Sequence, residues 1–70
     1  MRYLVIIEES ETGYGAYCPD LDGCVATGKT LQETAATMRE AVEFHIEALK
    51  ADGIDIPAPS SYVTYVEVTG

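Results

Sequence analysis

Residues 19–33 read Pro-Asp-Leu-Asp-Gly-Cys-Val-Ala-Thr-Gly-Lys-Thr-Leu-Gln-Glu, and this stretch determines most of the predicted fold. Residues 19–23 predict a tight polar turn, because proline fixes one φ angle and glycine releases another. Thr30 and Glu33 have the spacing of a capping box, in which the threonine hydroxyl accepts a hydrogen bond from an unpaired helical N–H. Residues 24–27 have room for one strand. The stretch therefore predicts a turn, a strand and a helix start in succession.

The sequence before this stretch predicts a β-hairpin. Residues 2–9 form the first strand, with apolar side chains on both of its sides. Residues 10–13 are a polar loop that ends in glycine, and residues 14–18 run back as the second strand. The strand at residues 24–27 extends this hairpin into a three-stranded antiparallel meander.

The sequence after this stretch predicts one long helix and a last strand. The helix is expected from about Leu31 to Asp52, with Gly53 as its stop. Its apolar stripe, with His45 at the edge, consists of Leu31, Ala35, Met38, Val42, Ile46 and Leu49. Residues 54–61 contain two prolines and form an extended connector, and residues 62–68, rich in Val, Thr and Tyr, form the fourth strand.

The predicted fold class is α+β, with the order β-β-β-α-β in a single domain over residues 1–70. A right-handed crossover places the fourth strand parallel to the first, so the first strand lies between the second and the fourth. The result is a four-stranded mixed sheet with one long helix on one face.

One helix leaves the other face of such a sheet uncovered, and an exposed apolar face usually marks an interface. We therefore expect a homo-oligomer, most simply a symmetric dimer. The candidate interface residues are Tyr3, Val5, Ile7 and Tyr65. The alternating pattern leaves open that Leu4 and Ile6 face outward instead. The fourth strand would contribute one of two sets, Tyr62, Val66 and Val68 or Val63 and Tyr65. A twisted sheet with a few solvated apolar side chains is the alternative.

Charge narrows the class of partner. Twelve acidic and four basic residues give a net charge of −8, which repels nucleic-acid phosphates and anionic lipid. The balance suits a basic protein surface, although acidity also simply keeps a chain soluble. The N-terminus lacks the pattern of a signal peptide and no run is long enough to span a membrane, so a cytoplasmic location is expected.

Candidate catalytic groups are few. Cys18, Cys24 and His45 supply at most three soft ligands, one short of a structural zinc site, so no metal or cofactor is expected. Cys24 and His45 are candidates for a thiol–imidazole pair, but no third orienting group can be named. We expect reduced, partly buried thiols, with a Cys18–Cys24 bridge only after oxidation, and no enzyme.

The predicted helix has an acidic outer face. The carboxylates of Glu40, Glu43 and Glu47 lie three, four and seven positions apart, with Phe44 among them. An aromatic anchor among carboxylates suits contact with a basic partner, while packing of Phe44 under the connector is equally open. Asp20 and Asp22 share the turn at residues 19–23, where they are turn-forming residues, candidate partner contacts or, less favoured, cation ligands.

Several linked stretches together resemble the HicB-like antitoxin family, over nearly the whole chain. They are Pro19-Asp20-Leu21-Asp22-Gly23-Cys24, Gly28-Lys29-Thr30-Leu31-Gln32-Glu33-Thr34, Arg39-Glu40-Ala41 and Ile56-Pro57-Ala58-Pro59. This chain has Asp22 where the family usually has proline, Lys29 in place of an acidic residue, and Thr34 in place of alanine. These departures leave the turn and the helix cap possible.

The resemblance implies a partly degraded RNase H-like fold and an antitoxin that covers the active site of a HicA-like toxin, a small basic mRNA interferase. Many members add a C-terminal DNA-binding domain; the sequence runs to Gly70 without one, so direct operator binding is not expected. RNase H-type catalysis is not expected either, because residues 3–7 carry no carboxylate for a two-metal site. The alternative functions are a solitary oligomeric module without a toxin and, less favoured, a thiol enzyme that uses Cys24.

Overall fold

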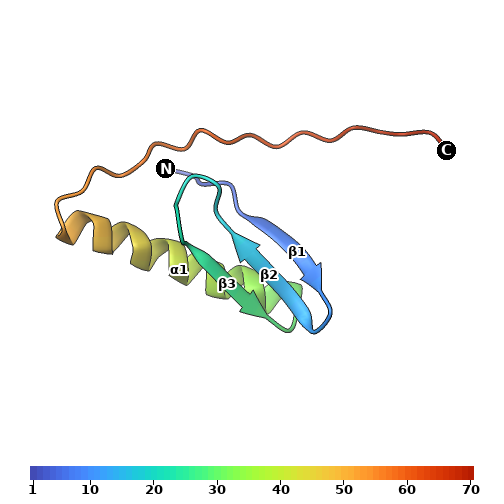
Figure 1. Cartoon of the computed structure of the whole chain (residues 1–70), viewed down its shortest axis with the longest axis horizontal. Coiled ribbons are helices and arrows are strands. Elements are labelled where there is room, and N and C mark those ends of the chain that lie inside the picture. The colour runs from blue at the N-terminus through green and yellow to red at the C-terminus, as the bar shows by residue number, and fades with distance from the viewer.

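The computed structural model describes residues 1–70 and contains a three-stranded antiparallel sheet with one long helix across one face (Figure 1). The strands are β1 (Ile6–Ser10), β2 (Gly13–Tyr17) and β3 (Val25–Gly28), and the helix is α1 (Leu31–Ala51). The predicted α+β class, the meander and the long helix are therefore confirmed. No helix of the chain combines the length and the apolar character that crossing a membrane requires.

The register of the sheet decides which side chains face the helix. Ala16 in the central strand lies opposite Ile7 in β1 and Ala26 in β3, and all three belong to the hydrophobic core or pack against it. Ile6 pairs with Tyr17 on the outer face, where Tyr17 is exposed. Because side chains alternate along a strand, the core-facing positions continue along the chain toward the N-terminus as Val5 and Tyr3.

Helix α1 begins and ends as the sequence predicts. Thr30 is the N-cap, and its Oγ1 accepts a hydrogen bond of 3.0 Å from the Glu33 N–H. The reciprocal bond of a complete capping box, from the Thr30 N–H to the Glu33 carboxylate, is not formed. Gly53 follows the C-cap residue Asp52 with a φ of 68°, the left-handed conformation that glycine adopts without strain.

The core is small and draws heavily on the turn at residues 19–23. Leu21 and Met38 are each 1% exposed, and Ala16, Cys18 and Cys24 complete the buried apolar cluster. Residues 18–24 fold back on themselves through a hydrogen bond of 3.3 Å from the Cys18 N–H to the Cys24 carbonyl. The turn is therefore a structural part of the core as well as a reversal of the chain.

The buried face of α1 is rotated from the predicted stripe at its first turn. Thr34 is completely buried, whereas Leu31 is 50% exposed. The Thr34 hydroxyl donates a hydrogen bond of 2.8 Å to the Thr30 carbonyl, which satisfies its polar group inside the core. Gly28 lies directly against this turn, since a Cβ there would lie 2.5 Å from Thr34 Oγ1. The close approach of β3 favours a compact hydrogen-bonded side chain at this point.

The prediction of a fourth strand is wrong for this structure. Residues 54–70 are extended but form no ladder, the sheet has the order β1-β2-β3, and β2 rather than β1 is central. The structure therefore does not hold the β-β-β-α-β order of an RNase H-like fold. Strand propensity measures how well side chains suit a pleated, half-buried surface, and a strand also needs an edge that its backbone can reach.

The first strand is shorter at its start than predicted. β1 begins at Ile6, whose partner Tyr17 is the last residue of β2. After Tyr17 the chain enters the turn and Pro19 offers no N–H, so residues 2–5 have no partner on the β2 side. They have none on the other side because no fourth strand is present.

Candidate partner-binding surface

The acidic face of α1 is the most charged surface that the sequence predicts, and the structure leaves it free. Glu40, Glu43 and Glu47 are all exposed on the middle and the second half of the helix. The only ion pair in the chain joins Lys50 Nζ to Glu47 Oε1 at 3.8 Å, between two largely exposed side chains. A pair of this kind contributes little and leaves the negative potential of the face largely intact.

Phe44 lies among these carboxylates and is 77% exposed. It therefore does not pack under the connector, which was one of its two predicted positions. An aromatic ring left in water between acidic side chains is available to a partner, and such residues often carry much of the energy of an interface.

Asp20 has a role that the sequence analysis did not identify. Its carboxylate accepts four hydrogen bonds from the connector: from the N–H groups of Ser60 and Ser61 at 3.1 and 3.3 Å, and from their hydroxyls at 3.0 and 2.8 Å. The bonds from Ser60 and Ser61 hold the pKa of Asp20 below its ordinary value of 3.8. Ser60 and Ser61 lie about forty positions from Asp20 in the sequence, so no local sequence pattern predicts this contact.

This arrangement separates the two aspartates of the turn. Asp20 is occupied within the chain, whereas Asp22 is exposed and accepts no hydrogen bond. No group of three or more His, Cys, Asp or Glu side chains comes together anywhere in the chain in a way that could hold a metal ion. Asp20 is therefore best described as an anchor for residues 60–61.

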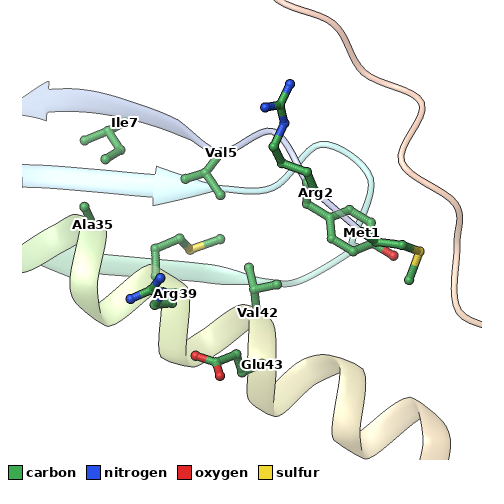
Figure 2. A pocket seen from close by; sticks show the side chains of 10 residues that line it. Met1, Arg2, Val5, Ile7, Ala35, Arg39, Val42 and Glu43 are labelled. Carbon is green, nitrogen blue, oxygen red and sulfur yellow. The ribbon is translucent and has the colours of Figure 1, made fainter.

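A shallow pocket opens between the N-terminal segment and α1 (Figure 2). Its volume is about 460 Å³, and its apolar lining comes from Met1, Tyr3, Val5, Ile7, Ala35, Met38 and Val42. Arg2, Arg39 and Glu43 lie at its rim, and Figure 2 shows Val5 and Val42 on opposite walls. The pocket exists because α1 lies mainly across β3 and β2 and makes few contacts with β1.

The expectation that Tyr3, Val5 and Ile7 lie on the uncovered face of the sheet is wrong, because the register of the sheet turns them toward α1. Tyr3, Val5 and Ile7 are partly buried and face the helix side, where they line this pocket, while Tyr65 is 90% exposed far along the chain. The Tyr3 hydroxyl also donates a hydrogen bond to the Pro57 carbonyl, a second anchor for the connector.

The thiols lie in the interior of the protein. Cys18 and Cys24 are both free and buried, and burial together with the neighbouring Cys18 raises the pKa of the Cys24 thiol. A raised pKa reduces the fraction of nucleophilic thiolate. No hydrogen bond joins His45 to Cys24, so the geometry does not assemble a thiol–imidazole pair.

The fold and its surfaces thus define a small α+β protein with an acidic helix face and an apolar pocket beside the helix. Residues 3–69 match the family described as "HicB_like antitoxin of bacterial toxin-antitoxin system". The chain belongs to this HicB-like antitoxin family, as the motifs around the turn and the helix cap predicted.

Similar proteins agree with this assignment. A chain of the solved structure described as "HicA3 and HicB3 toxin-antitoxin complex" is 35% identical, with a TM-score of 0.73 over 86% of this chain and 70% of that chain. UPF0150 protein ssr1765 of Synechocystis sp. is 41% identical over 80% of this chain and 72% of its own length. An uncharacterized 14.9 kDa protein of Haemophilus phage HP1 is 35% identical over 94% of this chain. This chain spans only 50% of that phage protein.

Proposed function

We propose that this protein acts as an antitoxin by binding a small basic HicA-like mRNA interferase and covering its active site. The observation that carries the proposal is the likeness to a chain from a toxin–antitoxin complex, which extends over most of this chain at 35% identity. The net charge of −8 supports a basic protein as the partner and argues against direct contact with nucleic acid. A cytoplasmic site of action fits a partner that cleaves mRNA.

The acidic face of α1 is the proposed contact surface. Glu40 and Glu47 are two turns apart on the helix, Phe44 lies between them, and all three are exposed. Carboxylates that attract a basic partner raise the rate of association, while a desolvated aromatic anchor lowers the rate of dissociation. The two kinds of residue therefore predict separable kinetic effects.

The test begins with a search beside this gene for a reading frame that encodes a small basic protein, which is then co-expressed and purified with the chain. The double reversal Glu40→Lys and Glu47→Lys is expected to lower the association rate at low salt at least tenfold. The matched control, Glu11→Lys with Asp55→Lys, changes the net charge equally at exposed positions away from α1. Equal losses in both double variants would show that total charge, and not the helix face, directs association.

Phe44→Ala tests the aromatic contact with the partner separately from the charges. We expect the association rate to stay within about threefold and the dissociation rate to rise at least tenfold, because a truncated hot-spot residue usually costs more than about 1–2 kcal/mol. If no basic partner binds the chain, and the ribonuclease activity of the candidate partner is unaffected by it, the antitoxin proposal is contradicted. That result would favour the solitary oligomeric module.

We also propose that the chain forms a homo-oligomer, most simply a dimer. Its accessible surface is 5671 Å², whereas a compact monomer of 7.6 kDa exposes about 4,300 Å². Its radius of gyration is 13.9 Å against about 11 Å for a compact domain of 70 residues. Both differences support a chain that buries further surface on assembly, and sedimentation equilibrium across a range of concentrations tests this directly.

A further inference from the structure

The C-terminal arm, defined here as residues 62–70, leaves the body of the protein as an extended segment (Figure 1). Its composition suits a strand, yet its apolar side chains are solvated. Between 62% and 91% of the surface of each is exposed: Tyr62, Val63, Tyr65, Val66 and Val68. A segment of β-branched and aromatic residues with no partner is a strand that lacks a sheet.

The outer edge of β1 lacks a strand. β1 is an edge strand, and residues 2–5 continue its line with no ladder on either side. The apolar pocket lies beneath this same edge, lined by Val5 and Ile7 from the strand side and by Ala35 and Val42 from α1. A further strand beside β1 would close the pocket and complete the cover of the helix.

The edge of β3 is the other free edge, and it is less suited to the arm. β3 has only four residues, and α1 already packs closely against it. The uncovered apolar surface of the helix side therefore adjoins β1 alone.

The chain does not use its own arm for this purpose. The connector is held by Tyr3 at Pro57 and by Asp20 at Ser60 and Ser61. Beside these anchors a gap of about 550 Å³ lies between residues 2–5 and residues 59–63, and no backbone hydrogen bond crosses it. The arm then diverges from β1 (Figure 1).

We propose that the arm of each copy pairs as an edge strand with the free edge of β1 in a second copy, so that two chains exchange arms. This inference rests on the proposed homo-oligomer and specifies how it forms. Alternation along the arm gives one side without charge, at residues 62, 64, 66 and 68, and another that carries Glu67. The uncharged side enters the apolar pocket of the partner.

Exchange fits the constraints of the connector. Pro57 and Pro59 stiffen residues 56–60, and the anchors at Pro57, Ser60 and Ser61 fix where the arm starts. Reciprocal exchange of an identical element is a low-cost route to a symmetric dimer, because each arm–edge contact is made twice. On the uncharged side each arm brings Tyr62, Val66 and Val68 to the partner's pocket, and a buried tyrosine alone contributes about 150 Å² of interface.

The test uses the full chain without substitution. Isotope-labelled and unlabelled chains are unfolded together, refolded as a mixture and studied by isotope-filtered NMR. We expect a particle of twice 7.6 kDa and nuclear Overhauser contacts between residues 62–68 of one chain and residues 3–7 of the other. A dimer in which these contacts occur only within one chain, or in which arms contact only each other, would overturn the exchange while leaving the homodimer intact.

Variants of the arm give a second, independent measurement. Tyr65→Pro removes a backbone donor from the arm and is expected to halve the particle mass while the helical circular dichroism is retained. Tyr65→Thr keeps the N–H and the strand propensity, so it should remain dimeric. If Tyr65→Pro stays dimeric, or if the unaltered chain is a monomer at high micromolar concentration, arm exchange is excluded. Neither result decides whether the chain binds a toxin, which the co-purification tests separately.

Discussion

Met38 provides the sharpest test of how α1 is packed. The side chain is 1% exposed, belongs to the buried cluster and also forms part of the floor of the open pocket. Leu31 is the natural comparison, because it lies on the same helix and on the stripe predicted from sequence, yet it is 50% exposed. We therefore compare Met38→Ala with Leu31→Ala.

The expected magnitudes differ clearly. Truncation of a buried methionine to alanine costs about 2–5 kcal/mol, including the cavity that it leaves. The cavity at Met38 would join a pocket that is already open to the surface, which places the expected loss near the lower end, at about 2–3 kcal/mol. Leu31→Ala removes only half-buried apolar surface, and alanine has a high helix propensity. The free energy of unfolding should therefore fall by about 1 kcal/mol or less.

Urea unfolding followed by circular dichroism at 222 nm, at one fixed protein concentration, measures both values. A domain of 70 residues has a free energy of unfolding of only about 3.5–10 kcal/mol, so Met38→Ala should lower the midpoint severely and Leu31→Ala slightly. Fixed concentration matters because assembly contributes to apparent stability. Equal losses for the two variants, or a larger loss for Leu31→Ala, would refute the rotated helix face.

Two further predictions concern the Asp20 anchor and the close contact between Gly28 and Thr34. Since the pKa of Asp20 is lowered by its serine partners, the stabilisation it provides is complete above pH 3.8 and is lost as the pH falls through its lower folded-state value. The amide NMR shifts of Ser60 and Ser61 should therefore titrate below pH 3.8. Asp20→Asn should abolish this titration and speed the hydrogen exchange of the two serine amides. A titration midpoint at or above pH 3.8 would contradict the anchoring role of Asp20. Gly28→Ala should cost about 1–3 kcal/mol in chemical denaturation, because the new Cβ would lie 2.5 Å from Thr34 Oγ1. Gly15→Ala is the control, since no atom lies within 4 Å of a Cβ there, and an equal loss at Gly15 would exclude the steric cause.

The two proposed surfaces meet on α1. Glu43 belongs to the acidic face and also lies at the rim of the pocket that the partner's arm would fill. A toxin bound along the acidic face would therefore contact the region next to the exchanged arm. This predicts that arm variants lower toxin affinity only through loss of the dimer, whereas Glu40→Lys with Glu47→Lys acts on the monomer as well.

Local chemistry in the sequence was sufficient for the elements around residues 19–33. The structure contains the turn at Pro19 to Gly23, the strand after it and the cap at Thr30. These three elements depend on backbone preferences and on bonds between residues a few positions apart. The same is true of the helix end at Gly53. The linked motifs also carried the family assignment, because their order reflects these local requirements.

Contacts between distant residues decided the rest. Asp20 binds serines forty positions away, and Thr34 rather than Leu31 is buried because Gly28 brings β3 against that turn of the helix. The composition of residues 62–68 favoured a strand, but pairing requires a reachable edge, and propensity contains no information about which edge that is. Sequence therefore determined what each segment can become, and the tertiary structure decided which segments find a partner within the chain.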